Sequence, residues 1–193
     1  MLELKTVFLV ILTLLNTSHV PKEKVIEGSC YLYTLSESMV AYADESVTAD
    51  ELITVAYHES KFSIYSVGEV VVSHKGACGP YQQIAKWAFP VDVPKPTCSD
   101  LHDPWEASYR AYSAIKHMKH AKSVGYLKSK EGGWACHYSA GINCNKAAFA
   151  YEVKHKRIKK RVRRLRRKMA KEVETFKNRV LFSLLENYCT FLF

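Results

Sequence analysis

The chain has 193 residues, enough for one domain with extensions, and its 48 % share of apolar residues excludes a protein that is disordered throughout. The net charge of +9 is unevenly placed, because residues 153–193 carry a net charge of +11 and residues 1–152 carry −2. A basic composition is typical of nucleic-acid binders, but this division argues against nucleic acid as a partner of the main body.

The first twenty residues contain Lys5, an apolar run over 6–15 and a polar end. The run is too short for a comfortable membrane span and has the length of a signal-peptide core. Glu3 and the lack of an Ala-x-Ala site are atypical of a cleaved signal peptide, so a membrane anchor and a buried N-terminal helix stay as alternatives. We expect residues 1–20 to be a signal peptide or anchor of an exported protein.

An even number of cysteines fits disulfides in an exported protein, although sequence alone does not choose among fifteen pairings. The six are Cys30, Cys78, Cys98, Cys136, Cys144 and Cys189. Cys136 and Cys144 bracket a short turn, Cys78 and Cys98 close a loop, and Cys30 and Cys189 remain. The alternatives are buried free thiols or a zinc site with His102 or His137. No CxxC pair supports zinc, and we predict neither a metal nor a cofactor.

Residues 21–47 are expected to be a connector with a short helical stretch, and a helix begins after Thr48. Thr48 followed by Glu51 is the capping-box pattern, and Leu52 and Val55 follow at helical spacing. Glu59 lies four residues after Val55, on or beside the same apolar face. A core-facing carboxylate must be protonated, paired or functional, and burial raises its pKa as a general acid requires. The alternative, which spacing alone favours, is a solvated surface glutamate.

The residues after Glu59 indicate the wall of a binding cleft. The run 67–72 is β-prone and predicts a short strand or hairpin flap, and Gly76 and Gly79 bracket a tight turn. The amides that follow can exchange hydrogen bonds with sugar hydroxyls, and the aromatic rings can stack on sugar faces or simply pack in the core. These residues are Tyr81, Gln82, Gln83, Trp87 and Phe89.

Three further helices are predicted downstream. Asp103 as N-cap and Pro104 at the first helical position start one that runs to about Lys122. A short helix spans about 131–141 and ends at a glycine. Another helix starts near Lys146 and continues into the basic end of the chain.

Four motifs occur in order within residues 45–155. They are Glu-Ser-x-Phe at 59–62, Gly-Ala-x-Gly-x-x-Gln at 76–82, Asp-Pro at 103–104 and Tyr-x-Ala-Gly at 138–141. Together they resemble the soluble lytic transglycosylase family of the lysozyme-like superfamily. The cysteine-rich version is most similar to enzymes of bacteriophages or bacterial surface systems, where the protein is periplasmic, extracellular or part of the virion.

The resemblance implies a mainly α, lysozyme-like α+β domain over 21–152 with a small β flap. It also implies cleavage of the β-1,4 bond between N-acetylmuramic acid and N-acetylglucosamine in peptidoglycan. Glu59 aligns with the single catalytic glutamate of the family. The substrate-binding residues that follow from the resemblance and the cleft pattern are Ser60, Tyr81, Gln82, Gln83, Tyr138 and Tyr151.

A typical glycosidase uses two carboxylates, and the sequence offers no convincing second one. Glu69 lies in the predicted flap, and Asp103 is better explained as a helix cap. A lone acid fits the transglycosylase route, which ends in 1,6-anhydromuramic acid. Hydrolysis by the same site and a catalytically silent wall-binding module are the alternatives.

Residues 153–193 predict a long basic amphipathic helix. The apolar residues recur in steps of three and four and form a helical stripe. They are Ile158, Val162, Leu165, Met169, Val173, Phe176 and Val180. The cationic face suits an anionic membrane or wall polymer, or nucleic acid, and the alternative is a solvated face whose apolar stripe packs on the domain.

Overall fold

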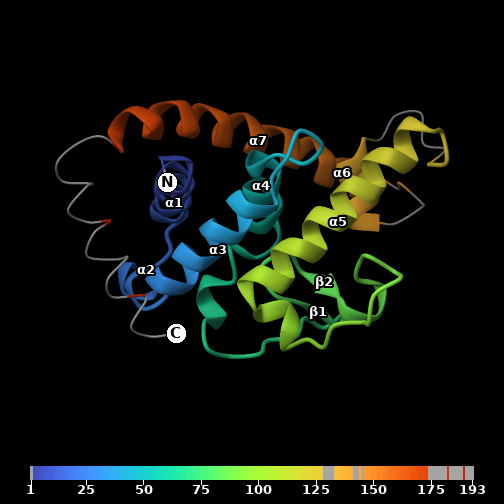
Figure 1. Ribbon diagram of the computed structural model, residues 1–193, viewed down its shortest axis with the longest axis horizontal. Helices are drawn as coiled ribbons and strands as arrows, with labels where there is room; N and C mark the ends of the chain where they lie inside the picture. Colours follow the sequence, from blue (N-terminus) through green and yellow to red (C-terminus); the bar gives the residue numbers. More distant parts are fainter. Residues whose placement is uncertain are drawn as a thin grey trace.

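The structure is a computed structural model that describes residues 2–127, 133–140, 144, 146–173, 182 and 189. It is mainly helical, as predicted (Figure 1). The helices are α1 (Leu2–Asn16), α2 (Lys22–Glu27), α3 (Ser29–Tyr42), α4 (Ala49–Ser60), α5 (Pro104–Ser123), α6 (Trp134–Ala140) and α7 (Lys146–Glu172). Two short strands, β1 (Ala77–Cys78) and β2 (Gln83–Ile84), pair antiparallel between α4 and α5.

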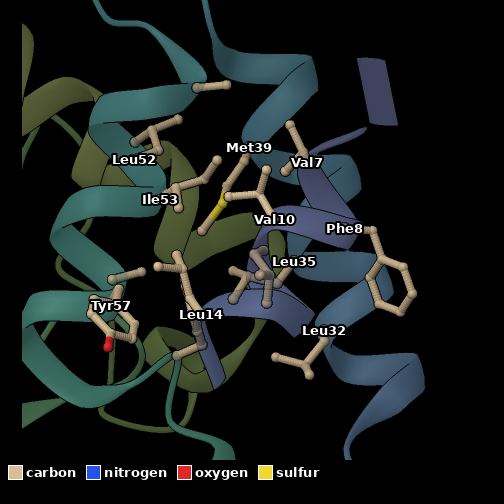
Figure 2. Packing of buried hydrophobic residues seen from close by; sticks show 14 of the residues in the cluster. Val7, Phe8, Val10, Leu14, Leu32, Leu35, Met39, Leu52, Ile53 and Tyr57 are labelled. Carbon is tan, nitrogen blue, oxygen red and sulfur yellow. The ribbon is translucent and has the colours of Figure 1, made fainter. Parts of the chain in front are cut away.

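The N-terminal helix α1 lies inside the core. Val7, Phe8, Val10 and Leu14 have no exposed surface and face apolar side chains of α3 and α4 (Figure 2). The apolar run of this segment, predicted to belong to a signal peptide or anchor, is therefore part of the core in this structure. Among the described helices, none combines the length and the hydrophobicity that a membrane span requires.

The predicted helix starts are confirmed. Thr48 and Glu51 form the capping box of α4, and the Asp103 carboxylate accepts a 2.8 Å hydrogen bond from the Glu106 amide at the start of α5. The connector predicted over 21–47 is more ordered than expected. It forms α2 and the 14-residue α3, because α3 carries a face that α1 and α5 cover.

The strand predicted over 67–72 is wrong. Only Val72 makes an isolated bridge, to Cys78, and Val70, Val71 and Val72 are each about half exposed. A β-prone run needs a partner strand and a surface to cover, and this one has neither. The small β element forms instead around the following turn, where Ala77 pairs with Ile84 and Cys78 with Gln83.

The six cysteines form three disulfides, Cys30–Cys189, Cys78–Cys98 and Cys136–Cys144. All three predicted pairings are confirmed. No thiol is left for the alternative zinc site. Three disulfides fit an oxidising, exported location.

Helix α7 runs along one edge of the molecule and packs on α1, α4 and α6 (Figure 1). It crosses the boundary predicted at 152/153 without a break. The apolar stripe from Ile158 to Val173 faces the core, with Val162 fully buried. Phe176 and Val180, predicted to continue this stripe, lie outside the described residues.

Glu51 joins three helices through buried ion pairs. Its carboxylate is 2.7 Å from the Lys119 ammonium of α5 and 2.7 Å from the Lys159 ammonium of α7, and the residue is only 3 % exposed. Burial alone would raise the pKa of Glu51, but these two lysines and the Thr48 amide lower the pKa to about 2. The network therefore stabilises the fold only while the carboxylate is ionised.

We expect Glu51→Gln to lower the free energy of unfolding by roughly 3 kcal/mol, because two lysines lose their shared carboxylate. Urea unfolding at pH 7 measures the change. The folded pKa lies below the unfolded value, so the contribution is present above about pH 4.5 and is lost as pH falls toward 2. The exposed Glu45, changed to Gln, is the control and should have no effect. Equal unfolding midpoints for the two variants would contradict the prediction.

Candidate active site

Glu59 lies in the last turn of α4, immediately before the sharp turn that ends this helix. Lys61, Phe62 and Ser63 are three consecutive non-glycine residues with φ between 55° and 63°. Left-handed backbone at such residues is uncommon and persists only where surrounding contacts fix it. Phe62 provides such a contact, because its side chain is fully buried and packs against Tyr57. The end of α4, and Glu59 with it, is therefore held in one geometry.

The surroundings of Glu59 favour a protonated carboxyl. Burial raises the pKa of Glu59 to about 7, although two groups act in the opposite direction. The Tyr151 hydroxyl donates a 2.5 Å hydrogen bond to Oε1, and the Lys154 ammonium attracts the carboxylate form. A carboxyl with a pKa near 7 can donate a proton at neutral pH and take it back afterwards.

No second carboxylate acts on Glu59 in the described part of the chain. The groups that shift its pKa are Tyr151 and Lys154. Glu69, the other acid considered from the sequence, lines a separate groove with Tyr31 and His102. Asp103 caps α5, as predicted.

Ser60 joins the end of α4 to the turn between β1 and β2. Its hydroxyl donates a 2.7 Å hydrogen bond to the Pro80 carbonyl and accepts a 2.8 Å bond from the Ser63 amide. The turn itself requires Gly79, where φ is +69° and a Cβ atom would collide with the Leu101 carbonyl. Ser60 therefore holds the site in shape, and its contact with substrate stays a prediction.

Tyr81, predicted to bind substrate, is a core residue, so that prediction is wrong. Its side chain is 1 % exposed and its hydroxyl lies 3.1 Å from the Ser108 hydroxyl. Its backbone carbonyl does help to build the site, because it accepts a 3.2 Å hydrogen bond from the Tyr138 hydroxyl of α6. The aromatic ring is part of the hydrophobic cluster at the centre of the molecule.

A cavity of about 880 Å³ is lined by Gln82, Gln83, Trp87 and Tyr138, among others. Glu59 does not line it. Tyr138 lies between the cavity and Glu59. It lines the cavity, and the pKa of its phenol is raised first by burial and second by the nearby Glu59 charge. The cavity offers polar and aromatic contacts together. The Gln83 Oε1 atom is buried without a hydrogen-bond partner in the described part, and Trp87 is 67 % exposed.

No family model, curated protein or solved structure matches this chain. Its function is therefore argued from the geometry and from the motifs. Of the predicted site residues, Tyr151 donates a hydrogen bond to Glu59, and Tyr138 lies close enough for the Glu59 charge to raise the pKa of its phenol. Their contact with a substrate stays a prediction. Among the described residues, no group of three or more His, Cys, Asp or Glu is arranged to hold a metal ion.

Two histidines beside Tyr151 were missed from the sequence. The His58 ring stacks on the Tyr151 ring at 4.1 Å between centroids, and the His155 ring lies parallel to Tyr151 at 6.3 Å. Burial lowers the pKa of both histidines to about 4, so they are neutral at pH 7. His155 is four residues after Tyr151, and this helical spacing is the signal that could have grouped them.

Proposed function

We propose that this protein cleaves the β-1,4 bond between N-acetylmuramic acid and N-acetylglucosamine in peptidoglycan, with Glu59 as a single general acid and base. The observation that carries the proposal is a partly buried carboxyl with a pKa raised to about 7 that accepts a hydrogen bond from Tyr151. It faces no second carboxylate in the described residues. A site with one acid restricts the chemistry to routes in which the substrate supplies the second group.

The substrate class is supported by the motifs that resemble soluble lytic transglycosylases. Three of these motifs, far apart in the chain, are joined by hydrogen bonds. The Ser60 hydroxyl donates to the Pro80 carbonyl, and the Tyr138 hydroxyl donates to the Tyr81 carbonyl. A helical body with a small β element between α4 and α5 is compatible with a lysozyme-like architecture. The disulfides suit an enzyme that meets peptidoglycan in the periplasm, outside the cell or in a virion.

In the first step, the protonated Glu59 gives its proton to the glycosidic oxygen as the bond from that oxygen to C1 of the muramyl residue breaks. The N-acetyl oxygen of the same sugar stabilises the positive charge that develops at C1. Glu59 is left as a carboxylate, which the Tyr151 hydroxyl stabilises through its 2.5 Å hydrogen bond. No protein nucleophile is needed in this step.

In the second step, the Glu59 carboxylate takes the proton of the C6 hydroxyl, and O6 forms a bond to C1. The product is a 1,6-anhydromuramic end, and Glu59 recovers the proton it had given away. If water attacks C1 instead, Glu59 takes the proton from water and the product is a reducing end. The two outcomes differ only in which hydroxyl occupies the space beside Glu59.

Mass spectrometry of purified cell walls after digestion tests the proposal. We expect soluble muropeptides with anhydromuramic ends, which are 18 mass units lighter than the corresponding hydrolysis products because water is not added. Reducing ends alone would identify a hydrolytic lysozyme with the same site. Walls that release no muropeptide while binding the protein would overturn the proposal in favour of a catalytically silent wall-binding module.

A further inference from the structure

Two sets among the cations of α7 have different surroundings. One set is paired with acids. Lys159 binds Glu51, Arg166 binds Asp50, and Lys156 binds Glu152. The other set, which we call the outward row, recurs in steps of three and four residues and is exposed throughout. Its members are Arg157, Lys160, Arg164, Arg167 and Lys171.

The outward row is a continuous line of positive charge. Steps of three and four residues place the five side chains on one helix face, over about 21 Å of axis. Within the described part of the chain, none of the five forms an ion pair. A hollow of about 800 Å³ on this surface is lined only by lysines and arginines of α7. The row is therefore a cationic surface that no acid among the described residues neutralises.

The apolar face of α7 argues against a membrane as the partner of the outward row. An amphipathic helix binds a membrane by burying its apolar face among lipids. Here Val162 and Met169 are buried, and Ile158 and Leu165 pack against the core beside α1 and α4. The apolar face is occupied, so the outward row can attract a partner only through charge and hydrogen bonds.

The row consists of Lys and Arg alone, which can contact phosphate groups or guanine edges, and it lacks the other side chains that commonly contact bases. Residues 157–171 contain no aromatic side chain to stack on bases and no Asn, Gln, Ser or Thr to contact base edges. Lys and Arg match the oxygens of phosphate groups, and such contacts need no bases. Three disulfides fit an exported location. Outside the cell, a phosphodiester polymer of the cell wall is a more accessible polyanion than nucleic acid.

We propose that the outward row binds a base-free phosphodiester polymer of the cell wall, a polyol phosphate chain. This inference deepens the proposed function and rests on it, because the bound polymer holds the enzyme at its substrate. Tyr151, which contacts Glu59, points to the opposite side of α7 from the row. The polymer on the row is therefore a second chain, distinct from the glycan strand at Glu59.

Binding of soluble poly(glycerol phosphate) to the full-length Glu59→Gln protein tests the proposal, because this variant keeps binding separate from cleavage. We expect saturable binding that weakens about tenfold when the salt concentration is doubled. Lys160→Gln with Lys171→Gln should weaken it about tenfold. The matched control, Lys22→Gln with Lys75→Gln, removes the same charge from exposed lysines outside α7 and should not change it.

Purified walls provide the second measurement. We expect the Glu59→Gln protein to sediment with intact walls and to lose at least tenfold in affinity after hydrofluoric acid removes the phosphodiester polymer. Equal weakening by both lysine pairs, or unchanged binding to stripped walls, would overturn the proposal. Tenfold tighter binding to DNA of equal charge, or to anionic vesicles, would overturn it in favour of those partners. Cleavage of stripped walls by the wild-type protein is measured separately, so failure of the proposed function is recognised independently.

Discussion

Replacing Glu59 with Gln is expected to lower the rate of wall cleavage by at least about 10³-fold, because a positioned general acid supplies roughly 10² to 10⁴ of the rate and this group acts twice. Glutamine keeps the shape of the side chain and can still accept the hydrogen bond from Tyr151. It cannot give a proton to the glycosidic oxygen. Muropeptide release from purified walls, followed by chromatography, measures the loss.

The same variant should be more stable than the wild-type protein at alkaline pH. Burial raises the folded pKa of Glu59 to about 7, above its value of 4.5 in the unfolded chain. The contribution of Glu59 to stability is therefore full below about pH 4.5 and is lost as pH rises through 7. Glutamine does not ionise and avoids this loss. At pH 8 the free energy of unfolding of Glu59→Gln should therefore be about 2 kcal/mol higher than that of the wild-type protein.

If Glu59→Gln is inactive and yet more stable than the wild-type protein, its loss of activity is not caused by misfolding. Glu69→Gln is the matched control, because Glu69 is exposed and lines a different groove, and it should keep both activity and stability. If Glu59→Gln releases muropeptides as fast as the wild-type protein, Glu59 is not the catalyst.

The helices could be predicted because their signals are local. Thr48 with Glu51 marks the start of α4, and Asp103 with Pro104 marks the start of α5, and both caps are present in the structure. The apolar stripe of α7 was likewise visible from its spacing. In each case the deciding interactions span only a few residues, so the sequence contains them in readable form.

The misses depend on contacts that are distant in the chain. An apolar run such as 6–15 looks the same whether it enters a membrane or a core, and its place between α3, α4 and α7 is decided by those helices. Tyrosine is a residue type that often contacts sugars, but the Tyr81 hydroxyl lies in the core, 3.1 Å from the Ser108 hydroxyl. Spacing alone does not distinguish these outcomes.

The candidate site shows the same division between local and distant information. Glu59 and Ser60 were found from a local motif, and Tyr138 and Tyr151 from their resemblance to positions in a family. The bond from Tyr151 to Glu59 joins residues 92 apart in the sequence. The pKa of Glu59 depends on that bond and on burial by α7, so only the folded chain reveals it.

The pH dependence of cleavage should follow the pKa of Glu59. The general acid acts in its protonated form, so activity should be full well below pH 7, half-maximal near pH 7, and about tenfold lower for each further pH unit. Tyr151→Phe removes the hydrogen bond that stabilises the carboxylate, so the midpoint should move to higher pH. Initial rates of muropeptide release between pH 5 and 9, each normalised to its own maximum, measure the midpoint.

Lys154 provides an independent test of this electrostatic account. Its ammonium also lowers the pKa of Glu59 but contributes less than Tyr151, so Lys154→Gln should raise the midpoint by a smaller amount. Lys146→Gln removes the same charge from an exposed position on α7 that does not act on Glu59, and should leave the midpoint in place. A midpoint that falls in Tyr151→Phe, or that shifts equally in the two lysine variants, would show that Glu59 is not the titrating group. The order of the midpoints of Tyr151→Phe, Lys154→Gln and Lys146→Gln therefore shows whether the titrating acid is the one beside Tyr151 and Lys154. A change in overall rate would not identify the acid in this way.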